Sequence, residues 1–207
     1  MKPRAILKKA RHRSRICLGL TGDLASGKSS VLKLFEKRKW KVISADAIVH
    51  EIYKEEGASL DQLRRECLKS EKNLRRLEKR IHPLVRKKVM AAIKETSKNC
   101  IVEIPLLFEA KTSYPFDAVI YVHAPKKDRK ARAQRRGMSS SLFEFLNSRQ
   151  WPSSKKALAS DFVIWNQGSR AFLKKQVGWI ANLFEVKNFS GLVVGVTSKS
   201  LSENPFL

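Results

Sequence analysis

The residues best suited to chemistry stand near the start of the chain, in the run Gly22-Asp-Leu-Ala-Ser-Gly27-Lys28-Ser29. Its spacing, GxxxxGK[ST], is typical of a loop that binds phosphates between a strand and a helix. Backbone amides and the helix dipole face the phosphates, Lys28 reaches the β- and γ-phosphates, and Ser29 binds Mg²⁺. The run predicts nucleoside triphosphate binding without separating kinases from GTPases or ATPases. The residues expected at the phosphates are Gly22, Ala25, Ser26, Gly27, Lys28, Ser29 and Ser30.

A carboxylate, Asp46, follows the second short apolar run of the chain. In open α/β sheets, ligands bind at the carboxyl ends of the strands, and Asp46 is expected at such an end. A carboxylate there can accept the proton of a hydroxyl group that attacks the γ-phosphate. The same residue could instead cap the helix that follows. The spacing leaves both roles open.

A helix rich in lysine and arginine is predicted at 126–136. Its Arg132 and Arg136 are four residues apart and therefore share one helical face. Arginines that fold over a bound nucleotide neutralise charge in the transition state of phosphoryl transfer. A solvated charged face or an RNA-contacting helix would have the same pattern, so these readings also stay open.

A folded scaffold must position these residues. Short apolar runs alternate with longer amphipathic stretches along the chain, which indicates strands that alternate with helices. This alternation predicts a three-layer α/β domain around a mainly parallel, five-stranded sheet. A break is expected at His82-Pro83, because the residue before proline disfavours the α region. A polar, Ser-rich segment leads to Gln150, and residues 191–197 form either one more strand or a loose tail. The expected strands are 15–21, 41–45, 100–104, 118–123 and 161–165, and the expected helices are 29–39, 48–55, 60–81, 83–96, 126–136 and 169–184.

The charge balance predicts polyanionic partners. The 207 residues include 43 Lys and Arg against 19 Asp and Glu, a formal net charge of +24. Such a charge attracts nucleic acid, anionic membranes or phosphorylated small molecules. No apolar run approaches the ~18 residues of a membrane helix, so we expect a soluble protein. Three scattered cysteines and a basic start without an apolar core favour a cytoplasmic location, with an Arg-rich organelle presequence as the alternative.

Six motifs follow one another in a specific order: GLTGDLASGKSSV (19–31), VISADAIVH (42–50), HPLV (82–85), EIPLLFEA (103–110), FDAVIYVHAP (116–125) and DFVIWNQGS (161–169). In this order the chain resembles the dephospho-coenzyme A kinase family, over roughly residues 16–178. The resemblance implies a P-loop kinase fold. Its expected parts are a basic arm at 1–14, a kinase domain at 15–186 with a helical acceptor subdomain at about 55–98 and a lid at about 126–150, and a tail at 187–207.

The resemblance also implies the reaction, which is transfer of the γ-phosphate of ATP to the ribose 3′-hydroxyl of dephospho-CoA. Lys28, Asp46, Arg132 and Arg136 would be catalytic, with Asp46 as the base and Ser29 as the ligand of Mg²⁺. Asn166 and Gly168 match the loop beside the adenine of ATP. Residues expected at the acceptor are Asp46, His50, His82, Pro105, Leu106, Leu107, Phe108 and Glu109. Several have a plainer interpretation: the histidines could bond backbone groups, and the apolar residues could pack in the core. Glu109 could orient the acceptor or a basic lid residue, or it could simply be solvated.

The chain departs from the family pattern at several positions. Ser44 stands where the second-strand motif usually has an acid, and Asp23 stands where the loop often has a glycine. Leu146 replaces a lid arginine, although Gln150 is kept. The segment between residues 57 and 77 is shorter than usual. Because that segment belongs to the acceptor subdomain, the way the acceptor binds is the expectation most affected.

Two other functions fit the residues less well. A kinase for another nucleoside or nucleotide would use the same loop and the same second-strand acid, so only the acceptor would differ. A nucleic-acid-binding protein switched by a nucleotide would explain the +24 charge. However, the arginine helix lacks interleaved aromatic residues for base stacking, and no known RNA or DNA motif is present. Specific nucleic-acid binding is therefore not expected. The sequence leaves nonspecific polyanion binding and the oligomeric state open.

Overall fold

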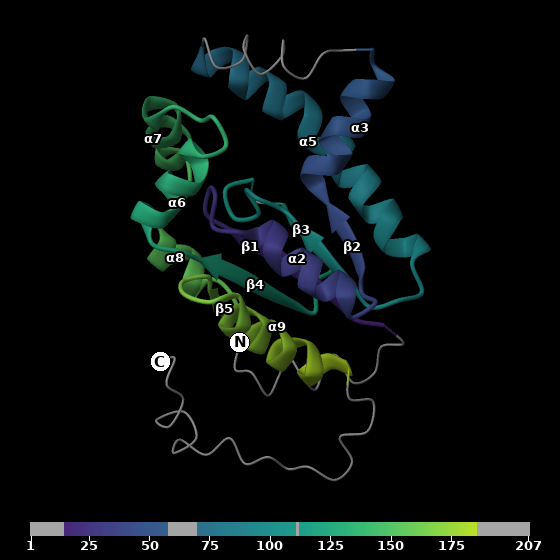
Figure 1. The fold of residues 1–207 in the computed structure, drawn as a ribbon. Coiled ribbons are helices and arrows are strands. Elements are labelled where there is room, and N and C mark those ends of the chain that lie inside the picture. Colours follow the sequence, from purple (N-terminus) through teal and green to yellow (C-terminus); the bar gives the residue numbers. More distant parts are fainter. Residues whose placement is uncertain (1–14, 58–69, 111, 186–207) are drawn as a thin grey trace.

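The computed structural model describes residues 15–57, 70–110 and 112–185 (Figure 1). At its centre is a five-stranded sheet in the order β2-β3-β1-β4-β5, in which every neighbouring pair is parallel. The predicted parallel α/β fold is thus confirmed. The predicted arm at 1–14 and the tail at 187–207, including its candidate strand, lie outside the described residues. The strands are β1 (Cys17–Gly22), β2 (Lys41–Ser44), β3 (Cys100–Glu103), β4 (Ala118–His123) and β5 (Phe162–Trp165).

Helices cover both faces of the sheet and form the two outer layers. On one face, Leu20 of β1 packs in a core cluster with Phe35 of α2 and Ile180 of α9. On the other face, Val102 of β3 packs in a second cluster with Val89 of α5. The described helices are α2 (Lys28–Lys37), α3 (Ala45–Glu55), α5 (Glu71–Glu95), α6 (Lys126–Gln134), α7 (Ser140–Ser148), α8 (Ser153–Leu158) and α9 (Arg170–Glu185).

The break predicted before Pro83 is wrong, because α5 continues through this proline. Ile81, Val85 and Val89 repeat at intervals of four residues and are all buried, so packing against the sheet holds the helix together across the site of the expected break. Pro83 cannot donate a hydrogen bond to the carbonyl group of Lys79. Both residues lie on the exposed side of α5, where water can satisfy that carbonyl.

The Ser-rich stretch after α6 is more ordered than its composition predicts. It contains α7, whose first turn is capped because Ser139 Oγ accepts a hydrogen bond from the Leu142 amide at 3.2 Å. Phe143 anchors the helix in the interior and is fully buried. The helix predicted at 126–136 is two residues shorter, since α6 ends at Gln134 and Gly137 follows with a φ of 83°. Helix α8 was not predicted.

Candidate active site

The phosphate loop connects β1 to α2, as its motif predicts. Ala25 has a φ of 59° and Gly27 a φ of 98°, and left-handed residues within such a loop turn backbone amides toward a common centre. A β-carbon at Gly27 would collide with the Asn166 side-chain amide, and the φ of 98° strains any other residue, so the position favours glycine. Among the described residues, Ser26 Oγ is buried without a hydrogen-bond partner. These features suit a loop shaped to surround an anion.

Lys28, the first residue of α2, folds back over this loop. Its ammonium group donates to the carbonyl oxygens of Gly22 at 3.2 Å and Asp23 at 3.3 Å. Burial lowers the pKa of Lys28 below its ordinary value, although the carboxylates of Glu103 and Asp46 act in the opposite direction. An anion at this place would offset the cost of burying the lysine charge.

Glu103 is a second carboxylate of the site, and it is not among the residues predicted from the sequence. It ends β3, the strand next to β1, and is only 7% exposed. Ser44 Oγ donates to Glu103 Oε2 at 3.0 Å. Burial raises the pKa of the Glu103 carboxyl, and the nearby charge of Lys28 partly counteracts this rise. An acid that ends a buried run such as Cys100–Glu103 was the available signal.

Asp46 lies in the first turn of α3, which begins at Ala45, three residues earlier than predicted. Ser44 caps this helix: its Oγ accepts a hydrogen bond from the Ala47 amide at 3.4 Å. The N-cap is therefore Ser44 and not Asp46. The Asp46 side chain is exposed and lines a pocket.

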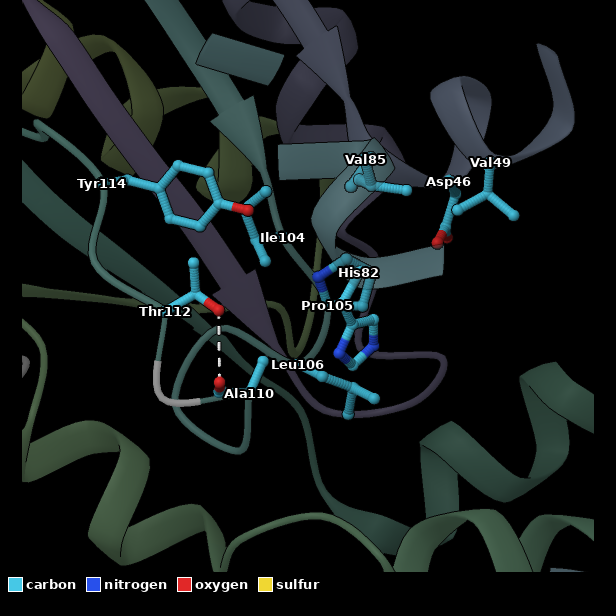
Figure 2. Close-up of a pocket in the computed structure, with 11 residues that line it drawn as sticks. Asp46, Val49, His82, Val85, Ile104, Pro105, Leu106, Ala110, Thr112 and Tyr114 are labelled. Carbon is cyan, nitrogen blue, oxygen red and sulfur yellow. Dashed lines mark hydrogen bonds between the residues drawn. The ribbon is translucent and has the colours of Figure 1, made fainter. Parts of the chain in front are cut away.

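Figure 2 shows this pocket, with Asp46 and His82 on its right and Tyr114 and Thr112 on its left. Thr112 donates to the carbonyl oxygen of Ala110 at 3.2 Å, which orients this part of the wall. Only one side carries an acidic group, and most of the wall is apolar. The lining residues are Ala45, Asp46, Val49, His82, Val85, Ile104, Pro105, Leu106, Ala110, Thr112 and Tyr114.

The structure thus brings four of the predicted acceptor residues to one pocket: Asp46, His82, Pro105 and Leu106. The other four lie elsewhere. His50 is exposed on α3, and Leu107 is part of a core cluster. Phe108 stacks on Trp151, with ring centroids 5.8 Å apart. Glu109 is paired with Lys156, whose nitrogen is 2.9 Å from Glu109 Oε1.

The two arginines that the sequence predicts for a lid occupy different places. Arg132 donates through Nη1 to the Ser26 carbonyl at 3.1 Å and through Nη2 to the Asn166 carbonyl at 2.9 Å. It therefore joins α6, the phosphate loop and the loop after β5. Arg136 lies beyond the end of α6 and is exposed. Gly168 is exposed as well, in the left-handed region with a φ of 92°.

The side chains of the site that could hold a metal ion carry mainly oxygen donors. In the part of the chain that the structure describes, no group of three or more His, Cys, Asp and Glu could hold one alone. Mg²⁺ does not need such a cage, because it keeps several waters and is bound through one or two carboxylates and substrate phosphates. The Ser29 hydroxyl and the carboxylate of Glu103 fit that requirement.

Within the described ranges, no helix combines the length and apolar character needed to cross a membrane.

A family model described as dephospho-CoA kinase matches residues 16–69 and 61–171 of the chain. The dephospho-CoA kinase of Zymomonas mobilis subsp. mobilis is 34% identical over 205 residues, which covers 89% of this chain and 100% of the relative. That of Aquifex aeolicus is 32% identical over 182 residues, covering 77% and 93%. The solved structure of TT1252 from Thermus thermophilus aligns with a TM-score of 0.69 at 26% identity, over 84% of this chain and 99% of the other.

Proposed function

The chain belongs to the dephospho-CoA kinase family, and we propose how its residues carry out the family's reaction. In that reaction the γ-phosphate of ATP passes to the ribose 3′-hydroxyl of dephospho-CoA. The products are coenzyme A and ADP, and the step is the last one in coenzyme A synthesis. The acceptor oxygen forms a bond to the γ-phosphorus, and the bond between that phosphorus and the β,γ-bridging oxygen breaks.

ATP binds with its phosphates in the loop from Gly22 to Ser30. Lys28 supports this assignment, because its buried charge lies within hydrogen-bonding reach of the loop backbone and suits a polyphosphate. Arg132 and Asn166 both bond the Ser26 carbonyl, so they hold the loop in shape on the lid side. Arg136 lies beyond the end of α6 and is exposed, and we assign it to the phosphates of bound ATP in a closed lid.

Asp46 accepts the proton of the 3′-hydroxyl. The observation that carries this proposal is its place, since it lines the pocket while its charge is close enough to act on Lys28. An acceptor in the pocket and a phosphate in the loop would then meet at this carboxylate. Because Ser44 supplies the helix cap, the exposed Asp46 side chain is available for chemistry.

The Ser29 hydroxyl would hold Mg²⁺, and Glu103 would supply the carboxylate for an ion that keeps most of its waters. When bound, the ion neutralises charge on the transferred phosphate. Glu103 suits this part because it is buried at the end of the strand beside β1 and is oriented by Ser44.

The adenosine end of dephospho-CoA occupies the pocket in Figure 2, whose volume of about 130 Å³ holds only part of the acceptor. His82 and Tyr114 offer polar groups on opposite walls, and Pro105 and Leu106 provide apolar contact for the adenosine end of the acceptor. His50 and Glu109 are assigned no direct contact, because neither lines the pocket.

Both substrates are polyanions, so the net charge of +24 steers them toward the protein and also binds other polyanions nonspecifically. We place the enzyme in the cytoplasm, where the buried thiols of Cys17 and Cys100 stay reduced.

An ATP-consumption assay over a panel of acceptors tests the proposal. The panel holds dephospho-CoA, nucleosides and nucleoside monophosphates, and the product is identified by mass. We expect turnover with dephospho-CoA that is at least about a hundredfold faster than with the others, since a site built for one acceptor discriminates strongly. Lys28→Ala is the inactive control, because the side chain serves phosphate and not the core. Faster turnover with a nucleoside would assign the pocket to another substrate.

A further inference from the structure

A buried cluster of four charged side chains adjoins the phosphate loop. Asp23, Arg129 and Lys156 are 2%, 4% and 0% exposed, and the Glu109 side chain is 12% exposed. The cluster has two negative and two positive charges and is therefore balanced. Charged side chains are rarely buried unless they are paired. Because these four are buried, solubility does not explain why they are charged.

Asp23, the second residue of the loop, is held from several sides. Its Oδ2 accepts hydrogen bonds from Tyr121 Oη at 2.6 Å and from Ser153 Oγ at 2.7 Å. Lys156 Nζ lies 3.5 Å from Oδ1, and Arg129 Nε lies 3.8 Å from Oδ2. Tyr121 belongs to β4, Arg129 to α6, and Ser153 and Lys156 to α8. The phosphate loop is thereby fixed to the scaffold at its second residue.

Glu109 extends the same cluster to the acceptor side. It belongs to residues 104–110, the segment that supplies Ile104, Pro105 and Leu106 to the pocket. Its Oε1 lies 2.9 Å from Lys156 Nζ and accepts a hydrogen bond from the Trp151 amide at 2.8 Å. One ammonium group thus contacts a carboxylate of the phosphate loop and a carboxylate of the pocket segment.

We propose that Lys156 is a positioning residue, which sets the phosphate loop at the correct distance from the acceptor segment 104–110. This inference rests on the proposed function, because it concerns transfer between those two sites. Buried ion pairs add little stability compared with apolar replacements, and their best-attested use is to specify one geometry. Phosphoryl transfer depends on such geometry, since a displacement of about 1 Å can cost about a hundredfold in rate.

A plainer role for Lys156 would be charge balance alone, and a pair of variants separates the two. Lys156→Met leaves an uncompensated buried carboxylate and is expected to lower Tm. Lys156→Met combined with Glu109→Gln restores the balance, with Asp23 facing Arg129. If Lys156 only balances charge, the double variant recovers both Tm and kcat. If it positions the two sites, Tm recovers and kcat does not.

The measurements are Tm, kcat and the KM for ATP, made with the acceptor that the panel identifies. If the proposed function fails, only the acceptor in the assay changes, and the comparison between the variants still holds. We expect a double variant whose Tm is close to that of the wild type, whose kcat is at least about tenfold lower and whose KM for ATP is within about threefold. Recovery of kcat to within about threefold at a restored Tm overturns the proposal. The control applies the same substitutions to the exposed pair Lys88–Glu55 and is expected to leave kcat unchanged.

If the double variant does not recover its Tm, Glu109→Gln alone provides a second test of the positioning role. The substitution preserves the size of the side chain but removes the charge that attracts Lys156, while Lys156 keeps Asp23 as a partner. We expect a folded protein with kcat at least about fivefold lower and an unchanged KM for ATP. A folded Glu109→Gln protein with wild-type kcat contradicts the positioning role.

Discussion

Asn166 Nδ2 donates a hydrogen bond to the Ser26 carbonyl oxygen at 2.7 Å, so the loop after β5 is fastened to the phosphate loop. Arg132 strengthens the same junction, because it bonds the carbonyl oxygens of both residues. Two segments separated by 140 residues in sequence thus act as one wall of the nucleotide site. Changes at this junction should affect ATP binding before they affect the core.

Gly27→Ala tests how tightly this junction is built. The new methyl group would collide with Asn166 and would also face a φ of 98°, which an L-residue adopts at a cost of about 1–2 kcal/mol. We expect kcat/KM for ATP to fall at least about a hundredfold, because the loop must deform. The matched control is Gly57→Ala, at a φ of 68° with open space around it. Steady-state kinetics on both should show near-normal kcat/KM for the control; an equal loss in both would contradict the account.

Arg132→Lys and Arg136→Lys should differ in kind. Lysine cannot reproduce the two hydrogen bonds that the fork of Arg132 makes to separate carbonyl groups. Arg132→Lys should therefore lower both Tm and kcat/KM. Arg136 is exposed, so Arg136→Lys should leave Tm within about 1 °C and reduce kcat/KM through the loss of bidentate phosphate binding. Thermal melts and kinetics on the same preparations test this; unchanged kinetics for Arg136→Lys would mark that residue as an ordinary surface charge.

The pH dependence of stability should include a contribution from Glu185, at the end of α9. Its hydrogen bonds with Arg38, and with Trp40 Nε1 at 2.6 Å, hold the pKa of its carboxyl below the ordinary value of 4.5. A lowered pKa in the folded state stabilises the protein above pH 4.5, and this contribution disappears as the pH falls through the folded-state pKa.

Glu185→Gln should thus lower the free energy of unfolding at pH 7 by about 1 kcal/mol or less, since the pair is partly exposed. The difference from wild type should shrink below pH 4.5. Urea unfolding at both pH values measures it, with Glu36→Gln on the exposed side of α2 as the control. A difference that grows toward acid would reverse the sign and refute the assignment.

The sequence predicted the sheet well, because each strand contains a short apolar run and each run is followed by a turn or a helix. It failed at Pro83, where local backbone preference indicated a break and tertiary packing of Ile81 and Val85 overrode it. It also missed α8, whose Lys156 is fully buried although its type is usually exposed. Only the partners of Lys156, which are distant in sequence, explain that burial.

The candidate site was predictable where a single motif defines it and less so elsewhere. The loop from Gly22 to Ser29 lies where its spacing indicates. The pocket in Figure 2 combines α3, α5 and the segment after β3, and spacing along the chain does not say which side chains meet there. Val49 and Tyr114 were therefore not predicted, and His50, one residue from Val49, points elsewhere.

The structure separates the proposed role of Asp46 as a base from a role in helix capping, because the N-cap of α3 is Ser44. Ser44→Ala should lower Tm, since the substitution removes the hydroxyl that bonds the Ala47 amide and Glu103. Asp46→Asn should leave Tm nearly unchanged, because its side chain is exposed and Asn preserves its size.

The most direct measurement compares the Asp46→Asn protein with the wild type. It determines ATP affinity and kcat toward dephospho-CoA on one folded preparation of each protein. We expect normal ATP affinity and a kcat lower by about 10²–10⁴, the range for loss of a general base. A loss between about threefold and about a hundredfold would assign Asp46 to positioning the hydroxyl, since a loose transition state needs less help from a base. A folded, ATP-binding Asp46→Asn protein with a kcat within about threefold of wild type would contradict the claim that Asp46 takes the proton.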